Sequence, residues 1–247
     1  VFFGLRFLPT GTNLSHMDFR VDAKNSIEFC DPLNPQFIPV VAMRSPVTMT
    51  VRLTGGTLAN GAESRFELAL ATASGKPLGP EDLLVTHTRK LHLLIVDERL
   101  TDYQHVHPVP GRKPGEWSFA FTPRGTGAYR CFADFTPAAT ARGLYASADL
   151  PRPPSVGSLQ RELGWTATRG EWRFALTPAA LPVRAGQPTD LKFAVARGDG
   201  GAVPLEPVMG AFAHLVAFDE ARSGFAHLHP TETDVTRRPD ATQPVLK

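Results

Sequence analysis

A stretch of seventeen residues occurs twice in this chain, at positions 92–108 and 214–230. The two copies align without a gap and share seven residues, three of which are histidines. In each copy the second histidine follows the first by 13 positions, and the third follows the second by two. Because self-similarity at a fixed spacing marks a duplicated structural unit, the chain is predicted to contain two copies of one domain.

The similarity extends upstream and sets the expected domain boundaries. Residues 60–70 and 185–195 both run through a glycine turn into an alternating apolar segment. We therefore expect four parts: an N-terminal arm, a first repeat, a Pro-rich linker and a second repeat, at 1–45, 46–150, 151–164 and 165–247. The arm opens with an apolar stretch that fits either the remnant of a signal peptide or membrane anchor, or a first edge strand.

Short segments separated by turns dominate the first repeat. The chain has 23 Pro and 21 Gly among 247 residues, which excludes long-helix bundles and coiled coils. Apolar or alternating segments recur at 47–53, 66–71, 91–96, 103–107, 117–121 and 128–135. This regular spacing predicts an all-β protein made of two tandem immunoglobulin-like antiparallel β-sandwiches.

The second repeat is shorter than the first at its C-terminal end. Segments 115–121 and 127–135 of the first repeat read as a closing hairpin, whereas the second repeat ends at residue 247, where such a hairpin begins. Residues 170–178 nearly copy 115–123, but they open the second repeat and do not supply the hairpin. We therefore expect either that the chain is truncated here or that the second repeat has an open sheet edge, which a protein partner can cover.

The net charge and the cysteine content limit the kinds of partner and cofactor that this chain is expected to bind. The formal net charge is only +2, and its basic residues are scattered, so nucleic acid is not an expected partner. The spacing of Cys30 and Cys131 matches no zinc or haem motif. The two cysteines can form a disulfide in an oxidising compartment or remain separate buried thiols.

The repeated histidines are the candidate metal ligands. His105 and His107 alternate along one strand, so their side chains point to the same face about 7 Å apart. His92 joins them if the hairpin has a four-residue loop at 98–101, but a five-residue loop turns it to the other face. The same reasoning applies to His214, His227 and His229, so each repeat can gather three imidazoles.

Three imidazoles with one open position suit copper, with zinc as the alternative. Five residues before the first histidine stand His87 in repeat one and Met209 in repeat two, which we expect to be fourth ligands. A thioether favours copper, because sulfur binds Cu(I) well and zinc poorly. In the competing interpretation the histidines are core residues that hydrogen-bond to the backbone.

Enzymatic interpretations are less favoured. The chain has no Gly-rich phosphate loop, no Gly-x-Ser-x-Gly elbow and no His-Glu-x-x-His. A three-histidine zinc hydroxide could hydrolyse a substrate, but no repeated carboxylate stands where a general base is needed. Asp97 and Asp219 also repeat, and we expect both to hydrogen-bond the backbone of tight turns.

The His-x-His-Pro ending, together with Gly127-Ala-Tyr-Arg-Cys-Phe-Ala-Asp-Phe135, resembles the bacterial secreted or periplasmic YtkA-like immunoglobulin-fold proteins. This resemblance implies an exported protein, periplasmic or extracellular, and the missing start leaves room for a membrane tether. The fold is also similar to that of the cupredoxin-like periplasmic copper carriers, by analogy only. From the sequence we expect a non-enzymatic copper-binding protein, for storage, delivery or sensing. The alternative is a structural or adhesion module of the cell envelope.

Overall fold

The computed structural model describes residues 14–19, 37–155, 164–184 and 186–247. Within these residues the chain divides into two compact units. Unit 1 contains 14–19, 37–155 and the segment Phe218–Phe225, and unit 2 contains 164–217 and 226–247, apart from residue 185. Most of the expected N-terminal arm and of the expected linker, and Cys30, lie outside the described residues.

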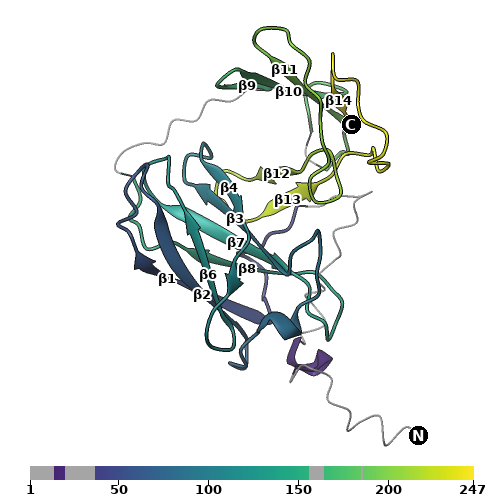
Figure 1. Ribbon diagram of the computed structural model, residues 1–247. Coiled ribbons are helices and arrows are strands. Elements are labelled where there is room, and N and C mark those ends of the chain that lie inside the picture. The colour runs from purple at the N-terminus through teal and green to yellow at the C-terminus, as the bar shows by residue number, and fades with distance from the viewer. Residues whose placement is uncertain (1–13, 20–36, 156–163, 185) are drawn as a thin grey trace, which may run out of the picture. The chain divides into compact units, whose positions relative to one another are not determined.

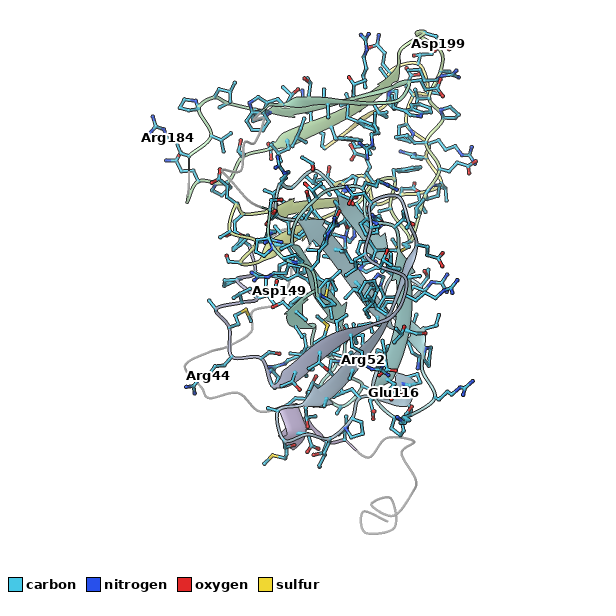
Figure 2. All side chains as sticks on the ribbon, turned by 90° about the vertical axis from the view of Figure 1, so that its left-hand side faces the viewer. Arg44, Arg52, Glu116, Asp149, Arg184 and Asp199 are labelled. Carbon is cyan, nitrogen blue, oxygen red and sulfur yellow. The ribbon has the colours of Figure 1, made fainter. Side chains whose placement is uncertain are left out.

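The first sheet of unit 1 has four antiparallel strands, in the order β1-β2-β6-β5. They are β1 (Val47–Gly55), β2 (Ser64–Thr72), β5 (Val109–Pro110) and β6 (Glu116–Phe121). Buried and more exposed residues alternate along β2, as expected for a sheet with one face on the core. On the other face, Arg52, labelled in Figure 2, forms an ion pair with Glu67 across β1 and β2 at 2.6 Å.

The second sheet of unit 1 faces the first and completes a sandwich (Figure 1). Its order is β4-β3-β7-β8, with β3 (Leu91–Asp97), β4 (Tyr103–Val106), β7 (Tyr129–Phe135) and β8 (Leu144–Asp149). The apolar core lies between the two sheets: Leu68 and Trp117 come from the first, and Leu93 and Cys131 from the second. Two short 3₁₀ helices, η1 (His16–Phe19) and η2 (Pro80–Asp82), complete the unit. The predicted β-sandwich is confirmed.

Strand β3 is buried along its whole length, although only one of its faces points into the core. The segment Phe218–Phe225, which belongs to unit 1, explains this burial. The ring of Phe225 is fully buried and lies 5.5 Å from the rings of both Phe132 and Tyr145, on the outer face of the sheet. The outer face of unit 1 therefore carries a second apolar layer.

Unit 2 repeats part of this arrangement. Its larger sheet has the order β14-β11-β10-β9, made of β9 (Thr166–Arg169), β10 (Trp172–Pro178), β11 (Leu191–Arg197) and β14 (Val245–Leu246). The sub-order β10-β11-β14 matches β1-β2-β6 of unit 1. Strands β12 (Leu215–Phe218) and β13 (Phe225–Leu228) form a separate two-stranded sheet. Segments 115–121 and 127–135 do not form the expected closing hairpin, because β6 and β7 belong to different sheets. In unit 2, β14 pairs with β11 as β6 pairs with β2, and among the described residues no strand corresponds to β7 or β8.

Cys131 is a free thiol in the core of unit 1, so of the two alternatives for this residue the separate buried thiol holds. Its Sγ lies 3.2 Å from the carbonyl oxygen of Ala148. Burial raises the pKa of this thiol to about 12, which makes it unreactive at neutral pH.

The described residues include no helix of the length and apolarity that a membrane span requires.

Candidate metal centres

The register of the β3–β4 hairpin brings the first histidine trio to one face. Leu93 pairs with Val106, and Leu94 pairs with His105. Continued by one residue, this register places His92 opposite His107. Residues directly opposite each other in an antiparallel pair share a face, so the four-residue loop, rather than the five-residue alternative, is the one observed.

Asp97 holds this loop closed. Its Oδ1 accepts hydrogen bonds from the backbone N–H groups of Thr101 at 2.7 Å and Asp102 at 2.9 Å. In the second repeat, Asp219 accepts from the backbone N–H and the hydroxyl of Ser223 at 2.6 and 2.7 Å. The expected turn role of both aspartates is confirmed, and the turn fixes the register that the histidines need.

The three imidazoles of unit 1 converge on one point. His92 Nδ1 lies 3.1 Å from His105 Nε2, and the ring centroids of His92 and His107 are 5.0 Å apart. One nitrogen from each ring lies within 4.8 Å of the other two. His92 is buried and the other two are partly buried. The structure thus assembles the trio that the spacing predicted.

A backbone carbonyl fixes the orientation of the His92 ring. His92 Nε2 lies 2.9 Å from the carbonyl oxygen of Thr86, which can only accept a hydrogen bond. Nε2 therefore carries the proton in the neutral ring, and Nδ1 presents its lone pair to the other two histidines. Metal-binding histidines are usually oriented in this way by a partner on the second nitrogen.

The Thr86 carbonyl belongs to a tight two-residue turn. Thr86 and Arg89 exchange both backbone hydrogen bonds, at 2.8 and 3.0 Å. The two central residues, His87 and Thr88, have φ angles of 47° and 71°, typical of a type I′ turn. His87 is exposed, and its ring centroid lies 6.2 Å from that of His92, so it lies beside the trio and not within it.

Unit 2 contains a copy of this centre. His214 Nδ1 lies 3.2 Å from His227 Nε2 and 3.0 Å from His229 Nε2. His214 Nε2 lies 2.9 Å from the carbonyl oxygen of Val208, as His92 does from that of Thr86. All three histidines are partly buried. The trio predicted in the second repeat is therefore also brought together.

The turn before His214 also matches its counterpart. Val208 and Ala211 exchange backbone hydrogen bonds at 2.8 and 3.2 Å. The central residues are Met209, with φ of 50°, and Gly210, with φ of 83°. Met209 occupies the backbone position that His87 occupies in unit 1. It is partly buried, although both of its neighbours in the turn are exposed.

Among the described residues, one nitrogen atom of the unit 1 trio is left without a hydrogen bond. His107 Nε2 is buried and has no hydrogen-bond partner among the described residues. In unit 2, two rings approach the single lone pair of His214 Nδ1. A metal ion bound at 2.0–2.1 Å would place tetrahedral nitrogens about 3.3 Å apart, close to the separations of His92 Nδ1 from His105 Nε2 and of His214 Nδ1 from the Nε2 atoms of His227 and His229.

Burial and nearby charges favour the neutral imidazole of His107. Burial lowers the pKa of His107, and repulsion from His92 and Arg89 lowers it further. Neutral imidazole is the form that binds transition metals.

One neighbour of the first trio was not identified from the sequence. In the β3–β7 register His92 pairs directly with Asp134, so their side chains share the outer face of the sheet. Nothing local to Asp134 signals this, because the pairing joins strands about forty residues apart. The carbonyl groups of Thr86 and Val208 were missed as well, since a backbone acceptor leaves no mark in the sequence.

Comparison with known proteins shows the family of the chain. No curated protein matches it. Among solved structures, the sporulation control protein Spo0M from Bacillus subtilis is 14% identical, with a TM-score of 0.25, over 63% of this chain and 69% of Spo0M. At that score the likeness carries no argument. A family model matches residues 45–147 and 167–244, so the chain belongs to the family described as a domain of unknown function, DUF8832.

Proposed function

We propose that this protein binds one transition-metal ion at each histidine trio, with copper as the preferred metal and zinc as the alternative. The observation that carries the proposal is the repeated trio, in which a backbone carbonyl holds the first ring so that its Nδ1 faces the Nε2 atom of the second histidine, and in unit 2 that of the third as well. Three neutral nitrogen ligands with an open fourth position suit copper or zinc.

Binding, rather than hydrolysis, is the activity that we propose. Neither trio includes a carboxylate ligand. Asp134 lies opposite His92 in unit 1, but the described residues of unit 2 place no carboxylate at the matching position, so the two centres do not share a general base that could activate a metal-bound water. Two similar centres in one chain are better suited to holding metal ions, or to passing them to a partner, than to catalysing hydrolysis. We propose storage, delivery or sensing of copper as the role.

The resemblance of the His-x-His-Pro segments to YtkA-like proteins supports a periplasmic or extracellular location. Exported copper proteins meet their metal in that compartment, and the location is part of the proposal. Fractionation of cells that produce the full-length protein tests it.

The competing function is a structural or adhesion module of the cell envelope. One observation favours it: the first ring of each trio has a backbone partner, as packing histidines do. The buried and unpartnered Nε2 of His107 speaks against it, because packing alone leaves no reason for that atom to lie unsatisfied. In this alternative the β12 edge of the two-stranded β12–β13 sheet, which pairs with no other strand among the described residues, binds a partner strand.

Metal content distinguishes the two functions. The protein is purified without chelator or nickel resin, loaded with copper, desalted and analysed by elemental mass spectrometry. We expect about two equivalents in the parent protein and about one in either the His105→Ala/His107→Ala or the His227→Ala/His229→Ala variant. The control is Arg52→Ala, which removes a surface ion pair and should leave the metal content unchanged.

If the loaded protein retains no metal, and both histidine variants have a lower melting temperature than the parent, the histidines have the structural function instead. Circular dichroism of each variant shows whether the β fold persists, so that loss of metal can be separated from unfolding.

A further inference from the structure

The two centres are built alike around the metal position, but their surroundings differ. The histidine spacing, the packing of the three rings and the carbonyl partner of the first ring match in both. What differs is the residue at the first central position of the preceding turn, and the presence of a strand beside the first histidine. Both differences change the chemistry offered to an ion.

The turn residue is an imidazole in unit 1 and a thioether in unit 2. In unit 1 this position brings the His87 ring centroid to 6.2 Å from that of His92. Met209 starts from the same backbone position, one residue after the carbonyl that holds His214. Its unbranched side chain is partly buried in a turn whose neighbouring residues are exposed, so it does not simply extend into solvent. A methionine placed here can add a sulfur ligand to the three imidazoles.

The second difference is charge. Strand β7 pairs with β3 in unit 1 and places Asp134 directly opposite His92. Within the described residues of unit 2, β12 pairs with β13 alone, and no carboxylate stands in the matching position. A negative charge close to a centre stabilises a divalent ion more than a monovalent one.

These two differences act in the same direction. Thioether sulfur is a soft ligand that selects Cu(I), whereas imidazole and a nearby carboxylate suit divalent ions. We infer that the unit 2 centre, with Met209 as its fourth ligand, is a Cu(I) site, and that the unit 1 centre prefers a divalent ion such as Cu(II) or Zn(II). This inference rests on the proposed function, because it assumes that both trios bind metal.

Exposure of the centres agrees with this division. His92 is buried at the unit 1 centre, whereas all three ligands of the unit 2 centre are partly exposed. An ion at the unit 2 centre is therefore easier for a partner to reach. The unit 2 centre is the one suited to exchanging Cu(I), and the unit 1 centre to retaining its ion.

Each centre can be studied alone in the full chain. The His105→Ala/His107→Ala background leaves only the unit 2 centre, and the His227→Ala/His229→Ala background leaves only the unit 1 centre. Affinity for Cu(I) is measured under anaerobic conditions with ascorbate, by competition with a chromophoric Cu(I) chelator. Affinity for Zn(II) is measured by competition with a zinc-binding dye.

Met209→Leu is the main test, because it keeps the volume and removes the sulfur. In the unit 2 background we expect the Cu(I) affinity to fall by at least about tenfold. The Zn(II) affinity should stay within about threefold, since zinc gains little from a thioether. Met43→Leu, a methionine change in unit 1, is the control and should alter neither affinity in this background.

The reciprocal exchange tests the same point in the other direction. Met209→His should shift the unit 2 centre toward Zn(II), and His87→Met should raise the Cu(I) affinity of the unit 1 centre. X-ray absorption of the Cu(I)-loaded unit 2 background should show a sulfur scatterer that Met209→Leu removes.

The failures of the inference and of the proposed function look different. If Met209→Leu leaves Cu(I) affinity and the absorption spectrum unchanged while the parent binds metal at both trios, the inference is wrong and the proposed function stands. If neither background binds Cu(I), Cu(II) or Zn(II), the proposed function itself fails.

Discussion

The Nε2 atom of His92 lies 2.9 Å from the carbonyl oxygen of Thr86. A tight turn, which begins at Thr86, lies between these two residues in the chain. The same separation links His214 and Val208 in the other unit. In both places a backbone acceptor fixes one tautomer of the first imidazole and turns its other nitrogen toward two further histidines. In both units, therefore, the backbone of a turn decides which nitrogen of the first histidine is available to bind a metal ion.

The tautomer can be observed directly. In metal-free protein at neutral pH, we expect His92 and His214 to carry their proton on Nε2, because only a carbonyl oxygen lies opposite that atom. Two-dimensional ¹H–¹⁵N NMR of the imidazole nitrogens reports the tautomer of each ring, with assignments from single His→Gln variants. Protonation at Nδ1 of either residue would show that the carbonyl does not orient the ring.

The turn predicts opposite effects of two substitutions. Thr88 has a φ of 71°, in the left-handed region, whereas the equivalent residue of unit 2 is Gly210. We expect Thr88→Gly to raise the free energy of unfolding of unit 1 by about 0.5 kcal/mol, because relief of the left-handed strain outweighs the added chain entropy.

Gly210→Thr should lower the free energy of unfolding by about 1 kcal/mol for the same reason. Urea denaturation of both variants measures these changes. Equal effects of the same sign would mean that the two turns do not share a conformation in solution.

Asp102 makes the stability of unit 1 depend on acid pH. Burial raises the pKa of this carboxyl, but hydrogen bonds from the Arg124 backbone, the Tyr129 hydroxyl and Gln104 outweigh burial and hold it below 3.8. The folded-state pKa is thus below the unfolded one. The contribution of Asp102 to stability is therefore complete above about pH 4 and is lost as the pH falls through the folded pKa.

Asp102→Asn isolates this effect. The free energy of unfolding at pH 7 should fall by about 1–3 kcal/mol, because buried donors lose a charged acceptor. The free energy of unfolding of the variant should also fall less steeply than that of the parent between about pH 4 and pH 2. Denaturant unfolding at several pH values checks this, and a decline as steep as that of the parent would assign the acid sensitivity to other carboxyls.

Asp134 should influence the metal affinity of unit 1 alone. Cross-strand neighbours have Cβ atoms about 4.5–5.5 Å apart, so its charge acts on an ion held by His92. Asp134→Asn should weaken Zn(II) binding at the unit 1 centre by about tenfold and leave the unit 2 centre unchanged. Competition titrations in the two single-centre backgrounds measure this, and equal weakening of both centres would indicate a general loss of stability.

The hairpins were predictable from the sequence because their determinants are local. The spacing of the histidines restricts the loop to four or five residues, and the structure shows the four-residue loop, which Asp97 holds closed. The same histidine spacing recurs around Asp219 in the second repeat, so the spacing around Asp97 is not a chance arrangement. The two expected closing strands of unit 1 are present as β6 and β7, but they belong to different sheets and form no hairpin. In unit 2, β14 pairs with β11 as β6 pairs with β2, which the sequence did not predict.

The parts that were missed depend on contacts between distant segments. Strand β8 follows a loop without a clear alternating pattern, and its pairing with β7 decides its conformation. Asp134 becomes a neighbour of His92 only through the β3–β7 register. The left-handed turn at His87 and Thr88 carries no glycine, so no turn residue marks it in the sequence, unlike Gly210 in unit 2.

The most direct test is anomalous diffraction from crystals of copper-loaded protein, with data on both sides of the copper absorption edge. We predict one anomalous peak about 2.0 Å from His92 Nδ1, His105 Nε2 and His107 Nε2, and a second in the same position among His214, His227 and His229. Loaded crystals with no peak at either trio, and with the imidazoles hydrogen-bonded to one another, would contradict the account.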